Sequence, residues 1–192
     1  MISAILLAAG QSKRMDGENK LLKKYKKKHF INHILNTLTK SKISKIIVVL
    51  GFQRSKVRKV LLKNKKIKCI YNKKYKSGMA SSIKAGLKKI SQKNTGFLII
   101  HADMPLVSTG IINLFCLGLN KSNKEIFVPI NKKKIGNPIG FKSSMIKFLN
   151  KIKGDKGAKK IIRRNKHKLY FIKINSKSIF RDFNTQRDFL IK

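Results

Sequence analysis

The chain has 192 residues, and 42% of them are hydrophobic, which is enough to bury the core of one compact domain spanning residues 1–192. Lysine and arginine number 47 against 7 aspartate and glutamate residues, which gives a net charge of +40. No apolar run approaches the roughly 18 residues of a membrane-spanning helix, so the composition predicts a cytoplasmic protein with no membrane partner.

The positive charge is spread along the whole chain and forms no single basic cluster. A nucleic-acid-binding surface would need clustered cations and, for single strands, regularly spaced aromatic side chains. A compositional bias therefore explains the lysines better than nucleic-acid binding does, and attraction to nucleic acid or to another anionic surface is the alternative. Carboxylates are correspondingly few, and any acidic metal ligand or general base comes from this set: Asp16, Glu18, Asp103, Glu125, Asp155, Asp182 and Asp188.

Strand-like and helix-like segments alternate along the chain. Apolar runs rich in β-branched residues predict buried strands at Ala4 to Leu7, Lys45 to Leu50, Ile67 to Tyr71, Phe97 to His101, Ile126 to Ile130 and Leu169 to Ile174. Helical periodicity appears between them, at Phe30 to Leu38, Val57 to Leu62, Ser81 to Ile90, Ile111 to Leu119 and Met145 to Ile152. This alternation predicts an α/β fold with a mostly parallel sheet, in which Cys69 and Cys116 are reduced packing residues.

A glycine-containing loop follows the first strand. It reads Leu7-Ala8-Ala9-Gly10-Gln11-Ser12-Lys13-Arg14-Met15 and is followed by Lys20. Small side chains let the backbone approach a nucleotide, and the consecutive N–H groups of such a turn cradle phosphate oxygens. Arg14 and Lys20 would add fixed positive charge. The alternative is a tight turn between a strand and a helix in a lysine-rich chain.

A second polar segment, from Asn72 to Ser82, leads from a strand into a helix. Ser81 or Ser82 could cap that helix and leave its free N–H groups open to an anion. A plain capped helix without a ligand is an equally good interpretation of these residues.

The strand from Phe97 to His101 ends in Ala102-Asp103-Met104-Pro105. An aspartate at the tip of a buried strand can hold a hard divalent cation, and the fixed ring of Pro105 restricts the turn that aims it. Asp103 is therefore the best Mg²⁺ ligand in the sequence, although a lone aspartate in this position is more often a turn or cap residue. We expect His101 to be a packed residue near the site.

Two later glycine segments contain Asn137-Pro138 and Asp155. Their residues predict turns, with Asp155 as a cap for the helix that follows it.

The pattern LAAGxSxRM with a later lysine resembles the opening signature of the MobA-like nucleotidyltransferase superfamily. The pair Ala8-Ala9 is similar to that of the molybdenum cofactor cytidylyltransferases, whereas guanylyltransferase relatives typically carry glycine in place of Ala9. The chain departs from the family at Asp16, which separates Met15 from the glycine that usually follows it. The resemblance runs from Ile5 to Phe189 and implies a single Rossmann-like domain. Its mostly parallel mixed sheet would be flanked by helices, with one strand reversed near the acceptor side.

The resemblance also implies roles for individual residues. The nucleotide-contacting positions of the family correspond to Leu7, Ala8, Ala9, Gly10, Ser12, Arg14, Lys20, Gly78, Ser81 and Ser82. Asp103 lies in the family's metal-binding DMP motif, and Asp182 or Asn184, in a segment similar to the closing DxDTPEDL, would be the second contact to Mg²⁺. Asn137, Pro138 and Asp155 match segments on the acceptor side of the cleft, whereas Asp188 would cap or pair on the last helix.

The implied reaction is transfer of CMP from CTP to the molybdenum cofactor, with pyrophosphate released and a molybdenum hydroxylase as client. Arg14, Lys20 and Asp103 would be the catalytic residues, because in-line phosphoryl chemistry needs positioning and charge neutralisation. The alternatives are a sugar-phosphate acceptor, GTP as donor, or a non-catalytic carrier of the cofactor.

Overall fold

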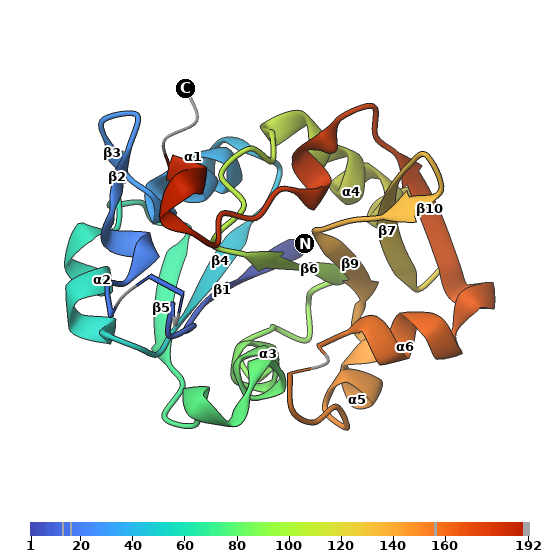
Figure 1. Ribbon diagram of the computed structural model, residues 1–192. Helices are drawn as coiled ribbons and strands as arrows, with labels where there is room; N and C mark the ends of the chain where they lie inside the picture. The colour runs from blue at the N-terminus through green and yellow to red at the C-terminus, as the bar shows by residue number, and fades with distance from the viewer. Residues whose placement is uncertain (13, 16, 156, 190–192) are drawn as a thin grey trace.

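A computed structural model describes residues 1–12, 14–15, 17–155 and 157–189 of the chain. A twisted sheet lies between two layers of helices (Figure 1). Helices α1 (Ile31–Lys40), α2 (Arg54–Val60) and α4 (Thr109–Lys121) contribute to the core on one face. The other face is covered by α3 (Met79–Leu87), α5 (Ile146–Leu149) and α6 (Lys159–Arg164). The predicted α/β class with a mostly parallel mixed sheet is confirmed.

The main sheet has eight strands within the described residues, in the order β10-β7-β9-β6-β1-β4-β5, with β8 beside β7. Their bounds are β1 Ile2–Ala8, β4 Lys45–Leu50, β5 Ile67–Tyr71, β6 Gly96–His101, β7 Ile126–Asn131, β8 Lys134–Ile135, β9 Ile139–Lys142 and β10 Leu169–Lys173. A small hairpin, β2 (Lys24–Tyr25) with β3 (Lys28–His29), stands apart from it. All six predicted strands are present, with ends shifted by two residues or fewer.

Strand β9 is the longest of the strands that the sequence pattern missed. It runs antiparallel to both β6 and β7, which makes it the reversed strand that the family resemblance implied. The strand has four residues and contains Gly140, so its apolar pattern is too short to be recognised. A Cβ at Gly140 would lie 3.1 Å from atoms of both Phe115 and Phe127, so the glycine lets α4 pack closely over the sheet.

The helices differ more from prediction than the strands do. Helix α2 begins three residues before the predicted start, and α5 has only four residues because Ser143–Met145 forms a 3₁₀ turn before it. Helix α6 was expected only as an unbounded helix after Asp155; its six residues are too few for a clear apolar repeat. Further 3₁₀ turns cover Lys20–Leu22, Tyr75–Ser77, Lys166–Lys168, Lys177–Phe180 and Gln186–Phe189.

The core consists of one apolar cluster on each face of the sheet. Strand β1 shows how the sequence divides between them, because alternate side chains point to opposite faces. Ala4 and Leu6 belong to the cluster beneath α1 and α4, whereas Ile5 belongs to the cluster beneath α3. Cys116 is buried in the first cluster and has a free thiol, and burial raises its pKa to about 11. A packing role for this cysteine is confirmed.

The parallel strands β1 and β6 carry the segments predicted to hold the chemistry. Leu7 lies opposite His101 in the register of the two strands, so the loops that follow β1 and β6 leave the sheet side by side, at the carboxyl ends of the strands. Ligands of open α/β sheets bind at this edge, outside the carboxyl ends of the strands. Within the described part of the chain, no helix is both long and apolar enough to cross a membrane.

Candidate active site

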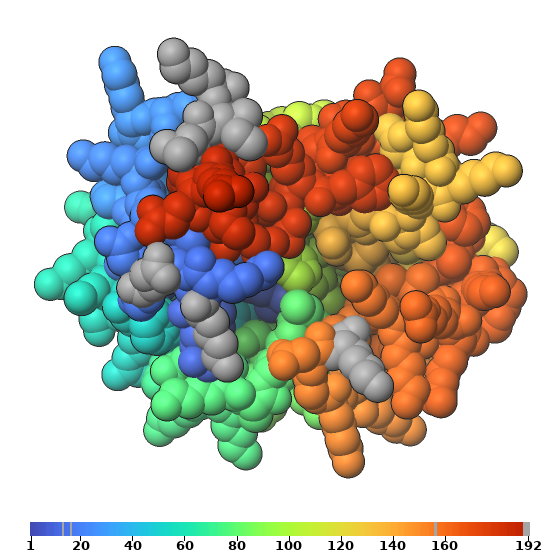
Figure 2. Space-filling model, viewed as in Figure 1, coloured from blue at the N-terminus to red at the C-terminus, as the bar shows by residue number. Residues whose placement is uncertain are grey.

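A cleft of about 460 Å³ opens at the carboxyl ends of β1 and β6. Figure 2 shows the face that contains it: the blue N-terminal loop, the green and orange segments and the red C-terminal segment meet around a central hollow. Its lining comes from five separate parts of the chain and consists of Leu7, Ala8, Ala9, Gly10, Gln11, Ser12, Arg14, Lys20, Leu21, Tyr75, Lys76, Gly78, Met79, Ser82, His101, Ala102, Asp103, Asp155 and Asn184.

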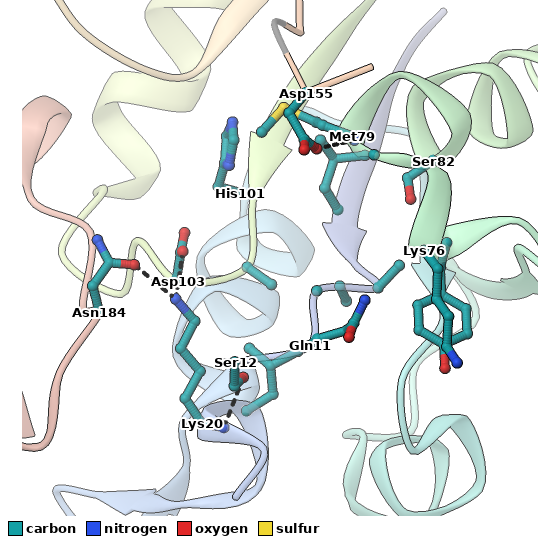
Figure 3. A pocket seen from close by; sticks show the side chains of 18 of the residues that line it. Gln11, Ser12, Lys20, Lys76, Met79, Ser82, His101, Asp103, Asp155 and Asn184 are labelled. Atoms are coloured by element: carbon teal, nitrogen blue, oxygen red, sulfur yellow. Dashed lines mark hydrogen bonds and ion pairs between the residues drawn. The ribbon is translucent and has the colours of Figure 1, made fainter. Parts of the chain in front are cut away.

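Lys20 joins three of the segments that line the cleft. Its ammonium nitrogen lies 2.7 Å from Oδ2 of Asp103 and 3.2 Å from Oδ1 of Asn184 (Figure 3). It also lies 2.8 Å from the carbonyl oxygen of Phe183. The side chains of Lys20 and Asp103 are only 14% and 18% exposed, so water screens this ion pair weakly. The lysine therefore neutralises the aspartate and fixes the C-terminal segment beside it.

Short-range bonds hold the backbone of Lys20 in place. The buried Asn19 caps the 3₁₀ turn by accepting a hydrogen bond from the N–H of Leu21, and its amide nitrogen donates to the carbonyl of Phe52. The N–H of Lys20 donates to Oγ of Ser12, which ties the turn to the glycine loop. Ser12 is thus placed in the cleft as a support for the loop's shape.

Oxygen atoms around Lys20 fit a hard divalent cation. Oδ1 of Asp103 is buried and has no hydrogen-bond partner among the described residues, which is unusual for a carboxylate. The amide oxygen of Asn184 lies beside the same Lys20 ammonium. Mg²⁺ is commonly held by one or two protein oxygens together with substrate phosphates. No group of three or more His, Cys, Asp or Glu side chains suited to a metal occurs in the described residues.

The N-terminus of α3 forms the wall opposite Lys20. Gly78 is its N-cap with φ of 100°, a conformation that favours glycine, and a Cβ there would lie 2.7 Å from the backbone of Gly154. Oδ1 of Asp155 accepts a hydrogen bond of 2.9 Å from the N–H of Met79, and the carbonyl of Gly154 accepts one of 3.0 Å from Ala80. The loop from α5 to α6 therefore closes onto the start of α3.

Two predictions about helix caps are wrong for this reason. Helix α3 begins two residues before Ser81, so neither Ser81 nor Ser82 caps it. Asp155 does not cap the helix that follows it in sequence, because α6 begins at Lys159 after Ala158. The aspartate instead serves α3, which lies 76 positions earlier in the chain.

The comparison with known families decides how this cleft is classified. Residues 4–169 match the family model described as "MobA-like NTP transferase domain". The chain belongs to this family. The match covers the glycine loop, the start of α3 and the DMP turn, and ends at the start of β10.

Relatives of this MobA-like domain include curated proteins of two names. A "Bifunctional protein GlmU" of Buchnera aphidicola is 32% identical over 141 residues, which are 73% of this chain and 29% of the relative. A "Probable molybdenum cofactor guanylyltransferase" of Clostridium perfringens is 32% identical over 127 residues, 66% of this chain and 58% of the relative. The match thus spans less than two thirds of either relative.

Solved structures share the fold over nearly the full length. The protein Rv0371c of Mycobacterium tuberculosis superposes with a TM-score of 0.86 at 23% identity, covering 98% of this chain and 95% of that one. A nucleotidyl transferase from Methanothermobacter superposes with a TM-score of 0.83 at 18% identity, covering 99% and 94%. The MobA-like domain therefore has the nucleotidyltransferase fold.

The structure places all but one of the predicted nucleotide-contacting residues of this domain in the cleft. All of those in the glycine loop, with Lys20, Gly78 and Ser82, line the cleft, but Ser81 does not. The hydroxyl of Ser81 donates towards the carbonyls of Lys74 and Gly78 and accepts from the amide of Asn72, so it holds the turn before α3. Its direct contact with a nucleotide has no support in this geometry.

Only some of the residues predicted to bind the acceptor or the metal line the cleft. Asp155 and Asn184 line the cleft, whereas Asn137, Pro138 and Asp182 are not among its lining residues. The N–H of Asn137 donates to the carbonyl of Ile179, which attaches β9 to the C-terminal segment. Oδ2 of Asp182 accepts a 2.6 Å hydrogen bond from the amide nitrogen of Asn184, and this bond turns the amide oxygen of Asn184 towards Lys20.

Asp188 holds the same C-terminal segment in shape. Its carboxylate accepts hydrogen bonds from the N–H groups of Asn184 and Thr185, and the bond from Thr185 is the main reason that its pKa is lowered. This is the capping role that the sequence suggested. Asp16 and Lys13, which bear on the predicted departure of the loop from the family, lie outside the described residues.

Several residues in the cleft were not predicted. Tyr75, Lys76 and Met79 line it, and they occupy the same turn as the predicted Gly78. Their position in that turn was the available signal. His101, expected to be a packed residue near the site, lines the cleft itself, and Figure 3 shows it between Asp103 and Asp155.

Proposed function

We propose that this MobA-like domain transfers CMP from CTP to a phosphorylated small molecule, with the molybdenum cofactor as acceptor and pyrophosphate as the second product. The observation that carries the proposal is the convergence of Lys20, Asp103 and Asn184 beside the glycine loop. A negatively charged triphosphate needs a cationic site of this kind, and an oxygen cluster within it provides for a metal.

Each side chain has a role that follows from its position. Asp103 and Asn184 would hold Mg²⁺, which supplies charge neutralisation at the phosphates when bound. Lys20 lines the cleft, so it could exchange its present oxygen partners for the oxygens of a bound triphosphate. Arg14 would add a second positive charge from the same loop. These charges would oppose the negative charge that develops on departing pyrophosphate.

The opposite wall would hold the nucleoside and the acceptor. Gly78 and Ser82 stand at the start of α3, where backbone N–H groups favour negative groups. Oδ1 of Asp155 accepts a hydrogen bond from the N–H of Met79, which attaches the loop before α6 to the start of α3. The acceptor substrate would therefore bind against a wall that is already formed. This arrangement would bring an acceptor phosphate in line with the α-phosphorus of the NTP.

The choice of CTP rests on the resemblance at Ala9. Ala9 is buried, and Gly51 makes room for it: a Cβ at Gly51 would lie 2.7 Å from the Cβ of Ala9. The relative named as a guanylyltransferase favours GTP as the second candidate donor. The molybdenum cofactor as acceptor, and a molybdenum hydroxylase as client, are supported by the same resemblance.

The test is pyrophosphate release by the purified protein with Mg²⁺, molybdenum-loaded molybdopterin and each of CTP, GTP, ATP and UTP in parallel. Release with CTP alone is the expected result. Release with GTP alone would support the nucleotidyl-transfer reaction but show that GTP, and not CTP, is the donor. Release only when a sugar phosphate replaces molybdopterin would overturn the acceptor, and tight cofactor binding without pyrophosphate from any NTP would favour a carrier.

Matched variants connect the activity to this cleft. Lys20→Ala removes the ammonium group that bonds Asp103, whereas Lys24→Ala removes an exposed lysine four positions away. Activity should fall in the first variant and persist in the second. Equal activity in both variants would show that the reaction, if present, does not use this site.

A further inference from the structure

Strand β5 forms one end of the sheet. It pairs with β4 and with no other strand in the described part of the chain (Figure 1). The N–H of Asn72 donates to Leu50 and the carbonyl of Lys66 accepts from Ile46, so even-numbered residues here face β4. In a parallel pair, successive residues direct their main-chain groups to opposite sides. Cys69 and Tyr71 therefore direct theirs to the open edge.

Two hollows flank this edge, one on each face of the sheet. The hollow beside α2 has a volume of about 300 Å³ and includes Arg54 and Arg58 in its lining. The hollow beside α3 measures about 670 Å³ and includes Lys84 and Lys88. Every charged residue that lines either hollow is basic.

The side chain of Tyr71 is held in a defined position between β5 and α2. The guanidinium of Arg54 lies 3.9 Å from the centre of the Tyr71 ring, a cation–π contact, and Tyr71 is 39% exposed. The edge thus has an aromatic side chain and basic side chains beside main-chain groups that pair with no other strand among the described residues. These are the components with which a sheet edge binds an extended peptide.

Charge selects the occupant of this edge. A second copy of the chain carries the same net charge of +40 and would bring arginine and lysine against arginine and lysine. Basic side chains on an edge strand normally prevent such pairing between copies. A segment rich in aspartate and glutamate would be attracted by the same side chains.

We propose that the β5 edge binds an extended acidic segment of a partner protein, which adds to the sheet as a further strand. Main-chain bonds to Cys69 and Tyr71 would fix the segment. Because alternate side chains of a strand point to opposite faces, its carboxylates would meet Arg54 and Arg58 on one face and Lys84 and Lys88 on the other. This surface is separate from the proposed reaction and does not depend on it.

The experiment measures binding of a fluorescent peptide with repeated Glu-Glu-Val-Val sequence by anisotropy. This repeat places carboxylates on both faces of a strand. The control peptide has the same sequence and charge, but a methyl group on each valine amide, which removes donors from both edges. We expect binding of the first peptide and a loss of about tenfold or more in affinity for the methylated one.

Variants outside the cleft locate the site. Arg54→Glu with Arg58→Glu should weaken binding by about tenfold, whereas Lys159→Glu with Lys160→Glu, an equal change in net charge on exposed positions of α6, should leave it nearly unchanged. Circular dichroism would check that both fold, and Lys84→Glu with Lys88→Glu repeats the test from the α3 side. Amide exchange at Cys69 and Tyr71 should slow when the peptide binds.

Four results would overturn the proposal. Equal affinity for the methylated peptide, or equal loss in both double variants, would show attraction by overall charge without strand addition. Unchanged exchange at Cys69 and Tyr71 with peptide bound would place the peptide elsewhere. Displacement of the peptide by a single-stranded DNA, with the same dependence on Arg54 and Arg58 and tighter binding, would assign the surface to nucleic acid.

Discussion

Lys20 and Asp103 are 83 positions apart in sequence, yet the lysine nitrogen lies 2.7 Å from the aspartate Oδ2. The pair is largely shielded from water, and the second oxygen of Asp103 has no partner among the described residues. The lysine therefore occupies a place at which a metal ion would also be stable. Competition between these two cations makes the site testable.

Asp103→Asn should lower the rate of pyrophosphate release by at least about a hundredfold, because the amide keeps the shape of the side chain but removes its charge. The rate would be measured at saturating NTP over a range of Mg²⁺ concentrations. Retention of the wild-type rate at any Mg²⁺ concentration would contradict the role given to Asp103.

Lys20→Met should destabilise the protein by about 3 kcal/mol, because it leaves the carboxylate of Asp103 without its counter-charge in a poorly solvated position. Added Mg²⁺ should recover part of this loss by taking the place of the ammonium group. Thermal unfolding with and without Mg²⁺ measures both effects. Lys24→Met, at an exposed position, is the control and should respond to Mg²⁺ as the wild-type protein does.

Asn184→Ala should raise the Mg²⁺ concentration needed for half-maximal activity more than Asp182→Ala does. The amide oxygen of Asn184 reaches the lysine directly, whereas Asp182 acts on it through a hydrogen bond to the amide nitrogen. Magnesium titrations of the two variants decide between them. A larger effect of Asp182→Ala would make that carboxylate the second metal ligand.

Gly51→Ala should destabilise the protein by about 1–3 kcal/mol, because the new methyl group would lie 2.7 Å from atoms of both Ala9 and Tyr75. Adding Ala9→Gly removes one of these clashes and should restore part of the stability. Urea unfolding of the two single variants and the double variant gives the coupling energy. Full additivity would show that the two positions do not press on each other.

Glu125 should make stability depend on acidity. Hydrogen bonds from Lys168 and from Ser144 lower its pKa below the usual 4.5, so its contribution is present above about pH 4.5 and is lost as pH falls through the folded-state pKa. Glu125→Gln should therefore flatten the fall in unfolding free energy below that pH. Chemical unfolding at a series of pH values tests this, and an unchanged slope would exclude the contribution.

The sequence alone determined the features that depend on near neighbours. Runs of apolar residues fixed the six predicted strands, because a buried strand needs a continuous or alternating apolar pattern over only a few positions. The glycine loop and Asp103 were located in the same way, each at the end of such a run. Parallel strands β1 and β6 then place the two segments at one edge of the sheet.

Only the tertiary structure decided which side chains meet. Asp155 caps α3 across 76 positions, Lys20 is held by three oxygens from two distant segments, and Ser81 turns away from the cleft to support a loop. Local periodicity contains no information about such pairs, because a hydrogen bond depends on distance and direction after the chain has folded. The strands could thus be read from the sequence, whereas the contacts within the site required the folded chain.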